Sequence, residues 1–222
     1  ACCLLPVAGS ITMTATSAKP ILSLNSIEVI YDHVILVFVP SCGACPTCAE
    51  GRPALCEPGA AANATNTLMS GGTRISLKGK PVGHHVGVSA FSEYAVVSQH
   101  SIVKIDKSLP FEEAALFGCA VVTGAGAVVN TARVTAGSTA AVVGLGGVGL
   151  MSMLAARMAG CRQIVAIDML DDKLKLAKQL GATDTVNAGE PDAVEKVRAL
   201  TSGGVDYAFE MASSVKALEL AY

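Results

Sequence analysis

The stretch TAAVVGLGGVGL, which runs from Thr139 to Leu150, decides the fold that this sequence predicts. Thr139 to Val143 is apolar and predicts a buried strand, and a helical pattern follows from Leu150 to Ala159. The turn between them contains Gly144, Gly146, Gly147, Val148 and Gly149. In a G-x-G-x-x-G turn the first glycine permits the tight bend, the second lets a pyrophosphate approach the backbone, and the third lets the helix pack on the strand. We therefore predict a dinucleotide-binding turn, with the phosphates at the helix start.

An acidic residue follows at the spacing that this kind of turn requires. Gln163 to Ile167 predicts the next strand, and Asp168 ends it, 19 residues beyond Gly149. A carboxylate at this place accepts hydrogen bonds from the adenosine ribose hydroxyls and repels a 2'-phosphate, so we predict NAD in preference to NADP. The alternative is that Asp168 only caps the helix predicted from Asp171 to Leu180.

Two more strand and helix pairs follow the acidic residue. Asp184 to Val186 precedes a helix that starts after Pro191, and Val205 to Phe209 precedes a helical run from Ser213 to the end. The predicted fold class is therefore α/β, with the first four strands of a doubly wound parallel sheet of the Rossmann type. The fifth and sixth strands of such a sheet would come after Tyr222.

The part of the chain before about residue 125 has a different pattern, that of a mostly β region. Short runs of branched apolar residues predict strands at Ser26 to Ile30, Val34 to Val39, Phe91 to Val97 and Ile102 to Ile105. After Pro110 the pattern becomes helical. We therefore predict three parts: an unassigned segment 1–25, a first domain 26–122 and a nucleotide-binding domain 123–222.

Four cysteines, Cys42, Cys45, Cys48 and Cys56, lie within fifteen residues in the spacing C-x2-C-x2-C-x7-C. Four thiolates in this spacing can surround one tetrahedral metal ion, which predicts a closed, structural zinc site on a long loop. Paired disulfides and an iron–sulfur cluster are the alternatives. The ordinary composition argues against a disulfide scaffold, and ferredoxin motifs continue with C-x3-C-P, which is absent here.

Composition limits the classes of partner. The 222 residues carry a net charge of -2 with no long run of either sign, which argues against a nucleic-acid or anionic-membrane surface. We expect a small-molecule substrate instead. Eight cysteines, several in metal-ligand spacing, indicate a reducing compartment, so we expect a cytoplasmic protein.

The four-cysteine segment and the glycine turn together resemble the zinc-containing alcohol dehydrogenases of the medium-chain dehydrogenase/reductase superfamily. The resemblance runs from about Asp32 to Tyr222 and includes FVPSCGACPTC from Phe38, GVSAFSEY from Gly87, Phe117-Gly118-Cys119 and Thr123-Gly124. It is closest to the horse-liver-type and glutathione-dependent formaldehyde dehydrogenase-like branches. The resemblance implies a GroES-like catalytic domain ahead of the Rossmann domain, hydride transfer between an alcohol or S-hydroxymethylglutathione and NAD, and assembly into homo-oligomers.

Residue by residue, the resemblance implies a role for several further side chains. Cys42, Cys45, Cys48 and Cys56 would bind the structural zinc, and Cys119 would be one of three ligands of a catalytic zinc. Thr123 would meet the nicotinamide, Val148 would pack behind its ring, Phe38 would line the substrate channel, and Lys173 would reach the adenosine ribose. Without the resemblance, Cys119 could also be a small, buried apolar residue, and Lys173 could be a solvated charge on a helix.

The sequence departs from the family pattern in its catalytic metal ligands. The early cysteine followed by His or Arg and then Ser or Thr is absent upstream of Cys42, and so is the Gly-His-Glu segment. His84 and His85 stand where the family has a non-ligating histidine, so we expect them to be surface or packing residues. We expect a sequence truncated at both ends and catalytically incomplete. The alternatives are a non-catalytic zinc- and NAD-binding fragment or a zinc-independent, quinone-reductase-like enzyme, which the four cysteines and Asp168 argue against.

Overall fold

The computed structural model describes residues 33–37, 39–88 and 99–222. The chain divides into two compact units, Ala1–Gly118 and Cys119–Tyr222, close to the boundary at residue 122 that the sequence predicts. The predicted segment 1–25, the predicted strands Ser26 to Ile30 and Phe91 to Val97, and Phe38 lie outside the described residues.

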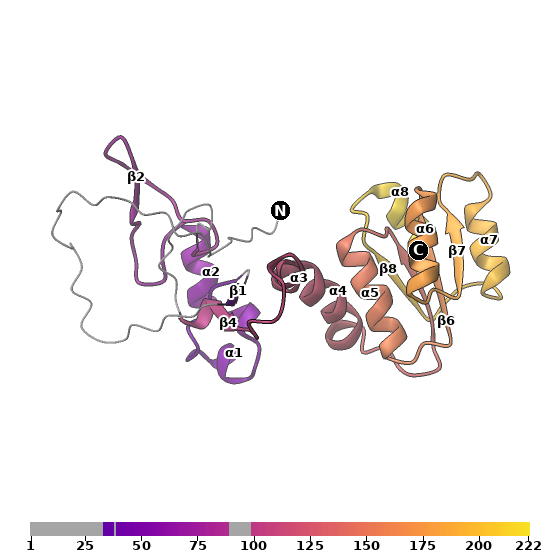
Figure 1. The fold of residues 1–222 in the computed structure, drawn as a ribbon, viewed down its shortest axis with the longest axis horizontal. Coiled ribbons are helices and arrows are strands. Elements are labelled where there is room, and N and C mark those ends of the chain that lie inside the picture. The colour runs from indigo at the N-terminus through magenta and orange to yellow at the C-terminus, as the bar shows by residue number, and fades with distance from the viewer. Residues whose placement is uncertain (1–32, 38, 89–98) are drawn as a thin grey trace. The chain divides into compact units, whose positions relative to one another are not determined.

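The second unit is built on a four-stranded parallel sheet (Figure 1). Its strands lie in the order β7-β6-β5-β8. Helices alternate with the strands along the chain, which confirms the predicted α/β class. The bounds are β5 (Thr139–Val143), α5 (Gly147–Met158), β6 (Gln163–Asp168), α6 (Asp171–Leu180), β7 (Asp184–Asn187), α7 (Ala193–Leu200), β8 (Tyr207–Glu210) and α8 (Val215–Ala221).

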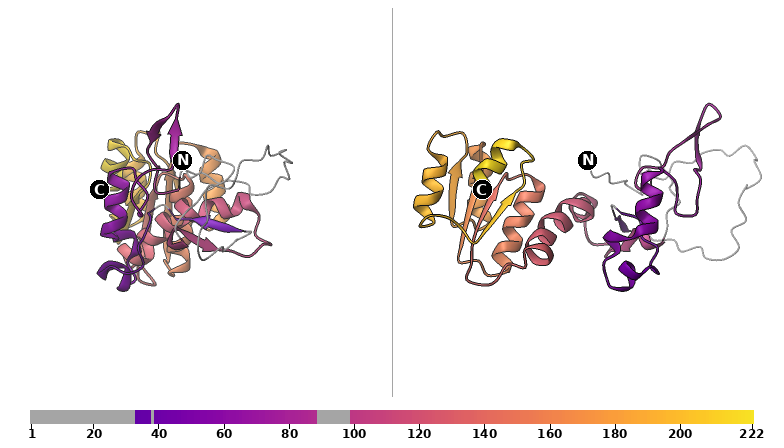
Figure 2. Two further views of the ribbon diagram at one scale, coloured as in Figure 1. Left: turned by 90° about the vertical axis from the view of Figure 1, so that its left-hand side faces the viewer. Right: turned by 180° about the vertical axis from the view of Figure 1, so that it is seen from behind.

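Helices cover both faces of this sheet, as the view from behind in Figure 2 also shows. On β5, Ala140 and Val142 pack in one apolar cluster with Met153 of α5 and Leu174 of α6. The neighbouring positions of the same strand, such as Ala141, join a second cluster with residues of α7 and α8. Alternate residues of a strand point to opposite faces, so a strand covered on both sides must be apolar throughout. All five residues of β5 are buried accordingly.

The strand order places a topological switch point beside β5. The chain moves from β5 to β6 on one side of it, whereas β8 returns to pair on the other side, with Val143 opposite both Ile167 and Glu210. In open parallel sheets the ligand binds outside the carboxyl ends of the strands at this point. The glycine turn leaves β5 at that edge.

The helical run Phe111–Thr131 joins the two units and consists of α3 (Phe111–Leu116), the π-helical turn η3 (Phe117–Val121), α4 (Val122–Gly126) and the π-helical turn η4 (Ala127–Thr131). Its length of 21 residues and its mean hydropathy of 1.6 meet, by length and composition, the criterion for a membrane-crossing helix. In the structure α4 packs directly on α5, where a Cβ added to Gly124 would lie 2.4 Å from the Val148 carbonyl oxygen. The Ser152 hydroxyl donates to the Gly124 carbonyl across this contact, at 3.2 Å.

In the first unit, the described residues form two antiparallel strand pairs and several short helical segments. Strand β1 (Val34–Leu36) pairs with β4 (Ile102–Lys104), and β2 (Ile75–Leu77) forms a hairpin with β3 (Lys80–Val82). The strand predicted from Val34 to Val39 is shorter than expected. The predicted metal loop contains α1 (Pro46–Ala49), the 3-10 turn η1 (Pro53–Leu55) and the start of α2 (Glu57–Ala64); a further 3-10 turn, η2 (Gln99–Ser101), precedes β4.

Candidate nucleotide site and four-cysteine site

The glycine turn between β5 and α5 has little room for side chains at two of its positions. Gly144 has a φ of 93°, and a Cβ there would lie 2.7 Å from the Ala212 nitrogen. At Gly149 a Cβ would lie 1.8 Å from the Gly144 carbonyl oxygen, so helix α5 rests on the turn itself. These contacts fit the tight-bend and close-packing roles that the sequence predicts for the first and third glycines.

The middle of the turn is open. No atom lies within 4 Å of a Cβ added to Gly146, and its φ of -75° is ordinary for any residue. Gly146 caps helix α5, so the first N–H groups of the helix follow directly at Gly147 and Val148. A helix start of this kind favours an anion such as a pyrophosphate. Gly146 and Gly147 are exposed, and Val148 is half-buried beside them.

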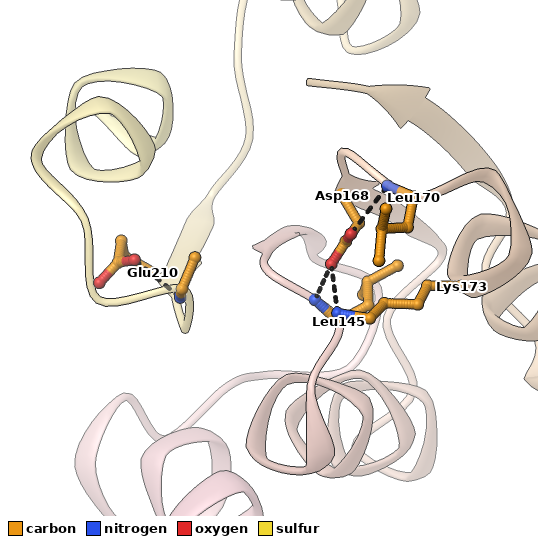
Figure 3. A network of polar contacts seen from close by, with 6 residues as sticks. Leu145, Asp168, Leu170, Lys173 and Glu210 are labelled. Carbon is orange, nitrogen blue, oxygen red and sulfur yellow. Dashed lines mark hydrogen bonds and ion pairs between the residues drawn. The ribbon is translucent and has the colours of Figure 1, made fainter. Parts of the chain in front are cut away.

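Asp168 binds the glycine turn (Figure 3). It ends β6, and one of its oxygens, Oδ2, accepts a hydrogen bond from the Leu145 N–H at 2.7 Å. The other oxygen, Oδ1, accepts from the Leu170 N–H at 3.0 Å, just ahead of α6. The carboxylate therefore joins two loops at the carboxyl edge of the sheet. The alternative of a helix cap holds only in part, because Leu170 is the residue at the cap position of α6.

Lys173 completes this network. Its ammonium lies 3.4 Å from Oδ2 of Asp168 and is partly exposed, whereas the carboxylate is almost buried. Burial by itself raises the pKa of Asp168. The N–H groups of Leu145 and Leu170 and the Lys173 charge outweigh burial and hold the pKa below its usual value. Asp168 is thus an anion at neutral pH, ready to accept hydrogen bonds and to repel a phosphate.

Sequence reasoning missed Glu210, the last residue of β8, which Figure 3 draws at the same edge of the sheet. Its Oε1 accepts a hydrogen bond from the Ala212 N–H at 2.8 Å. Ala212 is the residue against which Gly144 packs, so Glu210 supports the glycine turn from the side of β8. The signal was available, because an acidic residue directly follows the predicted strand Val205 to Phe209.

The four cysteines of the first unit converge on one point. The Sγ atoms of Cys42, Cys45, Cys48 and Cys56 all lie within 4.8 Å of one another, and the Cys45 and Cys56 sulfurs are 3.9 Å apart. Four sulfurs at the usual zinc distance in a tetrahedron are about 3.8 Å apart, so the cluster fits a zinc ion with a small contraction. All four are free thiols, which argues against the paired disulfides.

Backbone N–H groups point at these sulfurs. The Cys42 sulfur accepts from the N–H groups of Ala44 at 3.4 Å and Cys45 at 3.2 Å, which lower its pKa. The Cys56 sulfur, which is buried at the start of α2, accepts from the N–H groups of Cys42 and Gly59 at 3.2 and 3.3 Å. Such donors stabilise thiolates, the form that binds metal.

The other two thiols differ in acidity. A hydrogen bond with the Thr47 hydroxyl, followed by one from the Cys48 N–H, lowers the pKa of Cys45 to about 6. Burial and the neighbouring Cys45 sulfur raise the pKa of Cys48 to about 11. Metal binding at neutral pH therefore has to displace a proton from Cys48.

The remaining predicted site residues lie in the helical run. Cys119 is half-buried in the π-helical turn η3, and Thr123 is exposed on α4. Ala120, next to Cys119, lies 3.4 Å from the position of a Cβ on Gly147, so this turn is close to the glycine turn. Within the described ranges, Cys119 is not part of any group of three possible metal ligands.

His84 occupies a structural position. It is buried, and its ring nitrogen Nε2 accepts a hydrogen bond from the Arg74 backbone N–H at 3.1 Å. The His84 backbone N–H donates to the Asn66 carbonyl at 2.8 Å. These bonds hold the β2–β3 hairpin to the end of α2, in agreement with a packing role for His84. His85 is exposed.

Comparison with known proteins finds similarity to zinc-binding dehydrogenases. Residues 147–222 match the model of the zinc-binding dehydrogenase family. A solved structure of an alcohol dehydrogenase zinc-binding domain protein from Burkholderia ambifaria is 38% identical, with a TM-score of 0.76 over 85% of this chain and 51% of the other. Benzyl alcohol dehydrogenase from Acinetobacter calcoaceticus is 34% identical, with a TM-score of 0.75 over 89% of this chain and 53% of the other.

Residues 147–222 thus belong to the zinc-binding dehydrogenase family, and the chain as a whole is similar to zinc-containing alcohol dehydrogenases. A structure described as an NAD-dependent alcohol dehydrogenase is also similar, with 28% identity and a TM-score of 0.64 over 85% of this chain and 50% of the other. The chain thus spans about half of the length of the solved relatives it matches. The resemblance drawn from the glycine turn and the cysteine spacing is confirmed at the level of the family.

Proposed function

We propose that this chain is the zinc- and NAD-binding part of an oxidoreductase that transfers hydride between an alcohol and NAD. The observation that carries the proposal is Asp168, an anion held beside an open glycine turn at the switch point of the sheet. A carboxylate so placed accepts the ribose hydroxyls of NAD and repels the extra phosphate of NADP. S-hydroxymethylglutathione is a further possible alcohol substrate.

The residues of the second unit fit the binding of NAD. The open backbone at Gly146 leaves space for the pyrophosphate at the start of α5. Lys173 is partly exposed beside Asp168 and would reach the same ribose. Thr123 lies on α4 and Val148 on α5, and these two helices pack on each other. We propose that both residues line the nicotinamide site.

The metal chemistry divides between two places in the sequence. Cys42, Cys45, Cys48 and Cys56 would hold a structural zinc, since a closed shell of four sulfurs leaves no position for substrate. Cys119 would contribute one ligand to a catalytic zinc. When bound, a zinc ion with an open position and NAD supply the Lewis acid and the hydride acceptor of alcohol oxidation. The chain's own part is to orient the cofactor and exclude water around it.

An activity assay with defined metal content tests this proposal. The purified chain is loaded with zinc, and NADH formation from a primary alcohol, from benzyl alcohol and from S-hydroxymethylglutathione is followed at 340 nm. Turnover that is lost in Cys119→Ser but kept in Cys161→Ser, a cysteine outside both sites, supports an enzyme. Binding of both zinc and NADH without turnover with any of the three alcohols identifies a catalytically incomplete chain. A chain that binds neither zinc nor NADH contradicts the proposal.

A second function is favoured by one observation. Among the residues that the structure describes, the only group of three or more possible metal ligands is the four-cysteine cluster. Cys119 on its own is too few ligands for a catalytic zinc. A non-catalytic chain that binds zinc and NAD fits this observation, and NADH fluorescence enhancement without turnover would identify it. The free thiols agree with a reducing compartment, and we propose a cytoplasmic location.

A further inference from the structure

Thr47 is a half-buried residue of α1 that lies between Cys45 and Cys48 in the sequence. The role inferred for it below rests on the four-sulfur metal site of the proposed function. The Thr47 Oγ1 lies in hydrogen-bond contact with the Cys45 sulfur at 3.2 Å. The same oxygen lies 3.1 Å from the Leu55 carbonyl oxygen, so beside a Cys45 thiolate the single hydroxyl proton is shared between the sulfur and this carbonyl. Leu55 directly precedes Cys56.

The hydroxyl therefore joins the two segments that carry Cys45 and Cys56. Cys45 caps the start of α1, whereas Cys56 lies after η1 and caps the start of α2. Their sulfurs are 3.9 Å apart, close to the separation that a tetrahedral zinc requires. A link between η1 and the Cys45 sulfur fixes this separation before metal arrives.

Thr47 differs from the other hydrogen-bonding groups at the sulfurs because it acts through its side chain. At Cys42 and at Cys56 the donors described above are backbone N–H groups, which a side-chain substitution leaves in place. At Cys45 one donor is the Cys48 N–H and the other group is the Thr47 hydroxyl. A substitution can remove the hydroxyl, and with it the contacts to the Cys45 sulfur and the Leu55 carbonyl, while the backbone bond from the Arg52 N–H to the Thr47 carbonyl, at 2.8 Å, stays in place.

We propose that Thr47 is a positioning residue of the four-sulfur site, whose hydroxyl orients the Cys45 sulfur and ties it to the turn before Cys56. Groups of this kind orient metal ligands and are worth about 10- to 100-fold in metal affinity. Thr47→Val keeps the size and shape of the side chain and removes the hydroxyl. Its zinc affinity is expected to fall by about tenfold or more.

The experiment uses the full chain and two metals. Zinc affinity is measured by competition with a chromogenic chelator, and Co²⁺ binding is followed through the sulfur-to-cobalt charge-transfer bands of a four-thiolate site. Thr47→Val and Thr47→Ala both lack the hydroxyl, and Thr47→Ser retains it. Thr65→Val is the matched control, because the Thr65 hydroxyl donates to the Ala61 carbonyl on α2, at 3.0 Å, away from the sulfurs.

The expected result is weakened zinc binding and altered cobalt bands in the valine and alanine variants, with wild-type behaviour in the serine and Thr65→Val variants. Equal affinity and spectra in wild type and both hydroxyl-free variants would overturn the role of Thr47 and leave the metal site intact. So would an equal loss in Thr47→Ser, since packing of the methyl group would then explain it. A wild-type chain without a four-thiolate cobalt spectrum would overturn the metal site itself.

Discussion

Among the single residues, Asp168 has two roles, one structural and one proposed in cofactor binding. Its carboxylate holds the Leu145 and Leu170 N–H groups, and the same carboxylate is the proposed acceptor of the ribose hydroxyls. Because Leu145 is buried inside the glycine turn, the turn is already shaped before any cofactor arrives. Removing the carboxylate should therefore affect stability as well as cofactor choice.

The first prediction is a change in pH-dependent stability for Asp168→Asn. The folded pKa of Asp168 lies below its usual value, so its stabilisation is present above the unfolded pKa, near pH 4, and is lost as pH falls through the folded pKa. The variant should lose about 1–3 kcal/mol at pH 7 and show a smaller further loss below pH 4. Urea unfolding from pH 2.5 to 7 measures both.

Glu219→Gln, which changes an exposed carboxylate on α8, is the control for this series. It should follow the wild-type stability at every pH. An Asp168→Asn variant with a pH profile parallel to that of wild type would show that the hydrogen bonds to Leu145 and Leu170 contribute little.

At the scale of elements, the link between β5 and α5 depends on which glycine is changed. A Cβ on Gly149 would lie 1.8 Å from the Gly144 backbone, so the backbone would have to shift, which costs folding free energy. Gly149→Ala should therefore destabilise the chain by about 1–3 kcal/mol or more. Thermal unfolding followed by circular dichroism measures it.

Gly146→Ala is the matched variant in the same turn. Its Cβ points into open space and its φ is ordinary, so we expect a stability loss below about 1 kcal/mol. We expect weaker NADH binding from it, because the methyl group fills the space proposed for the pyrophosphate. If Gly149→Ala were as stable as Gly146→Ala, the packing assigned to the turn would be wrong.

Much of the second unit could be predicted because buried strands leave a plain pattern. Thr139–Val143 agrees with the prediction residue for residue, and Gln163–Asp168 includes the acid assigned to its end. The last strand begins two residues later than predicted, at Tyr207 rather than Val205. The Asp206 N–H and carboxylate bind Thr139 instead, so side-chain bonds replace the sheet pairing there.

The cysteine segment was harder to predict in its secondary structure than in its site. The spacing predicts the four-sulfur group, but it does not predict α2, whose alanine-rich sequence has no clear apolar face and contains Gly59. That helix depends on a tertiary contact, since a Cβ on Gly59 would lie 1.9 Å from the Pro40 carbonyl oxygen. Close approach of distant backbone segments leaves little trace in local sequence.

At the scale of the whole molecule, the metal and the nucleotide are assigned to different compact units. A structural zinc contributes folding free energy to the unit that holds it. Removing it with a strong chelator should abolish or lower the unfolding transition of the first unit. NADH binding by the second unit should persist, and parallel thermal scans and fluorescence titrations check both.

Cys56→Ser gives the same test without a chelator, because it removes one of the four sulfurs. It should lose the metal and the unfolding transition of the first unit, as the chelator does. Cys161→Ser should keep both the metal and this transition. NADH affinity that fell in step with metal content would contradict the separate assignment of the two sites.

A fluorescence titration of the full chain with NADH and with NADPH tests whether the glycine turn beside Asp168 is the NAD site. The anionic Asp168 beside the open turn predicts that NADH binds at least about tenfold more tightly, a difference of about 1.4 kcal/mol. The preference should disappear in Asp168→Asn. Equal or tighter binding of NADPH by the wild-type chain, or no binding of either nucleotide, would contradict the assignment of this turn as the NAD site.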